Sequence, residues 1–79
     1  MLIKVLGVGC ADCKKLYELT EQAIQELDVQ AQLVKVEDLI EIVAYGVMRA
    51  PALVVNEKVK AVGKVPKIDK IKQYISEEL

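Results

Sequence analysis

Residues 9–15 read Gly-Cys-Ala-Asp-Cys-Lys-Lys and contain the only two cysteines of the chain. An apolar run precedes this stretch and a helical pattern follows it, so both thiols are expected at the start of a helix. The unpaired N–H groups and the positive dipole end of a helix favour thiolate over thiol, which makes Cys10 the candidate nucleophile. Cys13 follows one turn later and can close a disulfide with Cys10 or resolve a mixed disulfide.

Hydrophobic periodicity on both sides of this motif predicts seven elements in the order strand, helix, strand, helix, strand, strand, helix. The first strand, the first helix and the second strand imply a right-handed parallel unit. The expected strands cover 2–6, 31–36, 52–55 and 58–63, and the expected helices cover 11–27, a short segment ending before Gly46, and a segment around Ile68, Ile71 and Ile75.

Two of these elements carry patterns that predict which side chains are buried. The second helix contains Leu39, Ile40, Val43 and Ala44 at helical spacing, which is typical of a helix with one apolar face. The last strand reads Lys-Val-Lys-Ala over 58–61. This alternation predicts an edge strand whose lysines face solvent and discourage pairing with other chains.

Composition limits the possible functions. The chain has 79 residues, of which 53% are hydrophobic, and we expect one compact α/β domain over 1–79. Eleven basic and twelve acidic residues are dispersed along it, so neither nucleic acid nor a membrane is an expected partner. The sequence shows no signal peptide and no apolar stretch of spanning length, which predicts a cytoplasmic protein. A static disulfide tends to be reduced there, so redox or metal chemistry remains.

Three segments together resemble a known family. They are the Gly9-Cys10-Ala11-Asp12-Cys13 motif, the Arg49-Ala50-Pro51-Ala52-Leu53 segment and the Val-Asn-Glu-Lys-Val hairpin over 55–59. In a chain of this element order they resemble the small thioredoxin- or glutaredoxin-like redox-active disulfide proteins of archaea and bacteria, over essentially the whole length. The resemblance implies a thioredoxin-like fold with a four-stranded mixed sheet in the order 2-1-3-4. The first and third helices would cover one face, and the second helix the other.

The resemblance also implies roles for individual residues. Cys10 would be the attacking cysteine and Cys13 the resolving one. Pro51 would be preceded by a cis peptide bond and would face both cysteines. Ala50 would offer backbone groups to an extended substrate, and Gly9 would let a partner chain approach Cys10 closely.

The expected function is therefore that of a thiol–disulfide oxidoreductase that reduces disulfide-containing proteins. It needs no cofactor, only an external donor, which is either a disulfide reductase or a small thiol. We expect a monomer. The carboxylate of Asp12 disfavours a thiolate at Cys10 and the charge of Lys14 favours it, so both are expected to tune the thiol.

The alternative is a module that binds a soft metal through Cys10 and Cys13. Two thiolates suit copper(I), but copper-trafficking domains usually run βαββαβ and have Met where this chain has Val8. With two cysteines and no histidine, one chain cannot build a closed tetrahedral zinc site from nitrogen and sulfur ligands. An iron–sulfur centre would have to be shared between subunits. We therefore expect no metal site within a single chain.

Overall fold

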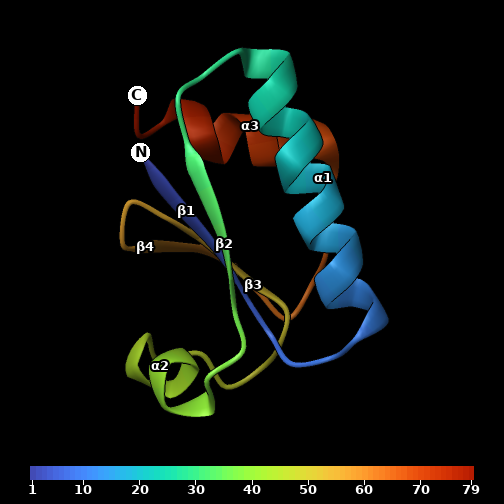
Figure 1. Ribbon diagram of the computed structural model, residues 1–79, viewed down its shortest axis with the longest axis vertical. Coiled ribbons are helices and arrows are strands. Elements are labelled where there is room, and N and C mark those ends of the chain that lie inside the picture. The colour runs from blue at the N-terminus through green and yellow to red at the C-terminus, as the bar shows by residue number, and fades with distance from the viewer.

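The computed structural model describes residues 1–79 without a gap, and its elements follow the expected order (Figure 1). None of its helices is long and apolar enough to cross a membrane. The elements are β1 (Leu2–Leu6), α1 (Ala11–Leu27), β2 (Gln32–Val36), α2 (Leu39–Ala44), β3 (Ala52–Val55), β4 (Lys58–Val62) and α3 (Ile68–Ser76).

The four strands form one mixed sheet in the order β2-β1-β3-β4, which confirms the predicted order. β1 pairs with β2 in parallel through the crossover helix α1, and β3 pairs antiparallel with both β1 and β4. Leu6, the last residue of β1, lies opposite Val36 on one side and Ala52 on the other. Because β1 and β3 are antiparallel, the loop that leaves β1 lies beside the loop that enters β3.

Helices cover both faces of the sheet as expected. Figure 1 shows α1 and α3 next to each other and α2 apart from both. On the face of α1 and α3, the fully buried core consists of Ile3, Val5, Leu16, Ala23, Leu53, Val55, Ala61, Ile71 and Ile75. On the face of α2, a smaller cluster consists of Leu6, Val36, Ile42, Val47, Ala52 and Val54. All four residues of the central strand β3 are buried, which explains its uninterrupted apolar run.

The second helix does not pack as its sequence pattern suggests. Leu39, Ile40 and Val43 are 66%, 82% and 59% exposed, and Ala44 is also exposed. Ile42 is the only buried residue of α2. The helix has six residues, less than two turns, so only one side chain can point at the sheet while its neighbours point away. The predicted apolar face is therefore wrong.

Lys4 ties α2 to the sheet. Its ammonium group donates to the Tyr45 hydroxyl at 2.7 Å and to the Glu41 carboxylate at 3.2 Å, and it lies 3.5 Å from a carboxylate oxygen of Glu57. The hydrogen bond to Tyr45, followed by that to Glu41, raises the pKa of Lys4 above its ordinary value. Lys4, the lysine that interrupts the apolar run of β1, therefore links α2 to the sheet.

The prediction of an edge strand is confirmed for β4, and Lys58 is exposed as expected, but the prediction is wrong for Lys60. The pairing of β3 with β4 shifts between Leu53 and Val54, so that Val54 lies opposite Val59 while Leu53 lies opposite Ala61. Lys60 is the extra residue of this irregularity, and strict alternation is lost. Its side chain is only 13% exposed and donates to Glu77 and Glu78 after α3 at 3.0 and 2.8 Å.

Candidate active site

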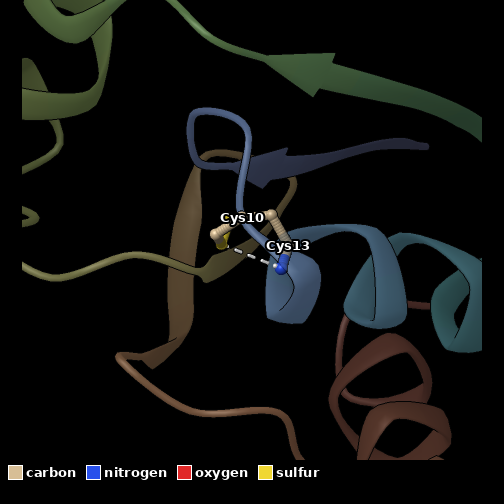
Figure 2. The surroundings of a disulfide bond; sticks show 2 residues. All are labelled: Cys10 and Cys13. Carbon is tan, nitrogen blue, oxygen red and sulfur yellow. Dashed lines mark hydrogen bonds between the residues drawn. A yellow bond between two sulfur atoms is a disulfide. The ribbon is translucent and has the colours of Figure 1, made fainter.

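The two cysteines form a disulfide at the start of α1 (Figure 2). Their Cα atoms are 5.2 Å apart, inside the range that a disulfide spans without movement of the backbone. The strand β1 ends at Leu6, the following loop carries Cys10, and α1 begins at Ala11. The C-x-x-C spacing therefore places both sulfur atoms within bonding distance, as expected.

Cys10 is the N-cap residue of α1. Its backbone is extended, with φ −105° and ψ 153°, and its sulfur accepts a hydrogen bond from the backbone N–H of Cys13 at 3.0 Å (Figure 2). This N–H is one of the helix-terminal donors that have no partner within the helix. Donors of this kind and the positive dipole end of a helix favour a thiolate over a thiol, so an ionised Cys10 in the reduced protein stays a prediction.

The two sulfur-bearing residues differ in exposure. Cys13 is 3% exposed and lies against the core, whereas Cys10 is half-buried. A partner molecule therefore meets Cys10 first, because Cys13 is covered. An attacking thiol has to be reached by a partner, whereas a resolving thiol has to reach only its neighbour, so the difference in exposure is compatible with the predicted roles.

The peptide bond between Ala50 and Pro51 is cis, the geometry expected from the resemblance. Pro51 is buried and its carbonyl accepts a hydrogen bond from Gly63, whereas Ala50 is exposed. A β-carbon built on Gly7 would contact both the Cys13 sulfur and the Ala50 β-carbon, so Ala50 lies close to the disulfide. The loop that enters β3 thus lies against the disulfide, as the antiparallel pairing of β1 and β3 requires.

The other predicted site residues lie at the surface around the motif. Gly9 is exposed with φ 56°, and the position of its missing β-carbon has no neighbour within 4 Å. Asp12 and Lys14 are exposed in the first turn of α1. In the disulfide neither sulfur carries an ionisable proton, so the influence of these two charges on Cys10 stays a prediction.

A groove next to these loops contains functional candidates that the sequence did not indicate. It has a volume of about 270 Å³ and only one charged lining residue, Arg49. Its lining consists of Val8, Leu39, Ile42, Val43, Val47, Met48, Arg49 and Ala50. Val8 belongs to the loop that carries Cys10, and Met48 is 86% exposed. The groove therefore adjoins the motif loop at one end and the outward-facing residues of α2 at the other.

The structure offers nothing that supports the metal-binding alternative. No group of three or more His, Cys, Asp or Glu side chains lies close enough together to hold a metal ion. The element order βαβαββα differs from the βαββαβ order that is usual in copper-trafficking domains.

Comparisons with known proteins point to one family. The thioredoxin domain model matches residues 1–76. The chain is 33% identical over 79 residues to the thioredoxin of Methanocaldococcus jannaschii, an alignment that covers 100% of this chain and 91% of that protein. It is 32% identical over 76 residues to the thioredoxin of Methanothermobacter thermautotrophicus, covering 96% of this chain and 99% of the relative.

Proposed function

This chain belongs to the thioredoxin family and is a thiol–disulfide oxidoreductase, and from that premise we propose that Cys10 attacks the substrate disulfide and Cys13 resolves the intermediate. The observation that carries the assignment is the contrast between the two residues. Cys10 is half-buried and accepts the N–H of Cys13, whereas Cys13 is 3% exposed. The more exposed of the two cysteines is also the one whose thiolate the helix terminus stabilises.

The reaction proceeds in two exchanges. The Cys10 thiolate attacks one sulfur of a partner's disulfide, forms a bond to it, and expels the other sulfur as a thiolate. The Cys13 thiolate then attacks the Cys10 sulfur, forms the intramolecular disulfide, and expels the second partner thiolate. The two partner thiolates take up protons from solvent. The partner has gained two electrons, and the protein has reached the disulfide state seen in the structure.

The substrate segment lies between the motif loop and the loop that enters β3. Gly9 and Ala50 are exposed on these loops, so an extended chain can approach the Cys10 sulfur along their backbones. Pro51 shapes the second loop by its cis peptide bond. The adjoining apolar groove then receives aliphatic side chains that flank the substrate cysteine, and an acidic side chain of the partner faces Arg49.

The rest of the cycle depends on partners outside the chain. A disulfide reductase or a small thiol returns two electrons to the Cys10–Cys13 disulfide, and no cofactor takes part. We place this cycle in the cytoplasm, where the thiol pool is reducing. The unit that acts is the single domain over 1–79, working as a monomer.

Reduction of a disulfide-bonded model protein tests this proposal. With dithiothreitol as donor, the wild-type protein accelerates the cleavage of the insulin disulfides well above the rate with dithiothreitol alone. Cys10→Ser abolishes the acceleration because the attacking sulfur is absent. Cys13→Ser retains the first exchange but stops at the mixed disulfide. Equal loss of the first exchange in both variants would contradict the assignment of roles.

A further inference from the structure

We propose that Gly7 is a positioning residue that sets the equilibrium between the dithiol and the disulfide. Because glycine has no side chain, the Cys13 sulfur can occupy the space where a β-carbon of residue 7 would stand. The inference rests on the dithiol–disulfide couple of the proposed function. It does not depend on which of the two cysteines attacks the substrate.

The geometry around Gly7 carries this inference. A β-carbon on Gly7 would overlap the Sγ atom of Cys13, and it would also lie 3.3 Å from the Cys13 β-carbon and 3.4 Å from the Ala50 β-carbon. Of the four glycines, Gly7 is the only one whose added β-carbon meets the disulfide. Gly7 is itself buried, so the Cys13 sulfur fills this position and solvent does not.

Hydrogen bonds and burial hold both Gly7 and Cys13 in place, so neither residue can easily move away from the other. The N–H of Gly7 donates to the carbonyl of Val36 at 3.0 Å, which holds the loop to the end of β2. The preceding residue, Leu6, is fully buried in the sheet. On the other side, the N–H of Cys13 donates to the Cys10 sulfur and the N–H of Lys14 donates to the Cys10 carbonyl at 3.2 Å. The first turn of α1 is thus fixed against the end of β1.

The contact affects the two redox states differently. In the disulfide, the bond to Cys10 holds the Cys13 sulfur in one place, beside Gly7. In the dithiol, the Cys13 side chain can turn about its Cα–Cβ bond to another staggered position. A methyl group at position 7 therefore penalises the disulfide more than the dithiol. The backbone of Gly7 has φ 158° in the disulfide form, and the equal effect of the substitution on the backbone of both forms is part of what the experiment below tests.

Redox titration of the Gly7→Ala variant tests the inference. In glutathione buffers we expect its equilibrium to move at least tenfold toward the dithiol, which corresponds to a potential about 30 mV less negative. Urea unfolding of the oxidised and reduced forms provides a second measurement, since the substitution must raise the unfolding equilibrium constant of the oxidised form at least tenfold more than that of the reduced form. The control is Gly46→Ala, because Gly46 has φ 77° but open space where its β-carbon would stand. That variant is destabilised equally in both forms and keeps its redox equilibrium.

A double-mutant cycle covers the case in which Gly7→Ala does not fold. In a Cys13→Ala background the sulfur is absent, so we expect the double variant to fold and Gly7→Ala to cost severalfold less stability than in the wild-type background, where failure to fold sets a lower bound on the cost. An unchanged redox equilibrium, a shift toward the disulfide, or an equal loss in the Cys13→Ala background would each overturn the inference. Failure of the proposed function gives a different result. The wild-type protein would not reduce insulin, while Gly7→Ala would still shift the redox equilibrium.

Discussion

The sulfur of Cys10 accepts the backbone N–H of Cys13 at 3.0 Å, so each redox cysteine acts on the other through both a covalent bond and a hydrogen bond. The hydrogen bond needs no side chain other than that of Cys10. It arises because a helix begins immediately after Cys10 and leaves the N–H of Cys13 without a helical partner. The spacing of two residues between the cysteines is what allows both contacts.

The first prediction concerns the ionisation of Cys10 in the reduced protein. We expect its pKa to be below the ordinary thiol value of about 8.5, because the N–H of Cys13 and the helix dipole favour the thiolate. The negative charge of the Asp12 carboxylate in the first turn opposes a thiolate at Cys10, so Asp12→Asn is expected to lower the pKa of Cys10 further. Thiolate absorbance is followed against pH in the Cys13→Ser background. A Cys10 pKa at or above ~8.5 would contradict the prediction.

The second prediction concerns the apolar groove. A charge in place of Val43 hinders the docking of aliphatic side chains, and loss of about 1.5 kcal/mol of apolar burial corresponds to roughly a tenfold rise in KM. We therefore expect Val43→Lys to raise KM for insulin and to leave the rate with a small disulfide such as oxidised glutathione unchanged. Ile40→Lys is the matched control, since Ile40 is on the same helix and 82% exposed but does not line the groove. Equal effects of the two substitutions would exclude the groove.

The third prediction tests the corrected packing of α2. Ile42 is 6% exposed and packs into the core, so Ile42→Ala is expected to cost about 2 to 5 kcal/mol of unfolding free energy. Ile40→Ala removes the same atoms from an exposed position and changes stability by less than about 0.5 kcal/mol. Urea unfolding of the two variants measures the difference. Comparable losses would mean that the helix presents a different face to the sheet.

The fourth prediction concerns acid sensitivity at the end of α3. The hydrogen bond from Lys60 lowers the pKa of Glu78 below its ordinary value. Because the pKa of Glu78 is lower in the folded protein than in the unfolded one, its ionised form stabilises the fold at pH values above the unfolded pKa of about 4.3. This stability is lost as the pH falls through the pKa of Glu78 in the folded protein. We therefore expect Lys60→Met to be less stable at neutral pH and to lose less stability on acidification below about pH 5. Lys64→Met, at an exposed lysine without an ion pair, should retain the wild-type profile, and an unchanged profile in Lys60→Met would contradict the prediction.

Much of the fold could be predicted from local patterns in the sequence. The strand 2–6 and the helix 11–27 have the predicted bounds, because their apolar spacing matches one period and their ends carry clear signals. The sheet order and the cis bond before Pro51 followed from the resemblance rather than from any local pattern. The disulfide followed from the C-x-x-C spacing.

Other features depend on contacts that periodicity does not encode. The pattern of Leu39, Ile40 and Val43 suggested burial, but these side chains are exposed and do not enter the core; Leu39 and Val43 line a surface groove instead. The irregular pairing of β4 breaks the alternation on which the solvated position of Lys60 was predicted. No pattern in the sequence singles out Gly7, because its contact with Cys13 joins a loop to a helix and exists only in three dimensions.

The measurement that tests the division of roles most directly is the trapping of a mixed disulfide. The reduced Cys13→Ser variant is incubated with insulin, and the conjugate is digested without reductant and mapped by mass spectrometry. Our account predicts a stable conjugate joined through Cys10, and no stable conjugate from Cys10→Ser, in which Cys13 is covered. A conjugate that forms through Cys13 in Cys10→Ser as readily as through Cys10 in Cys13→Ser would contradict it.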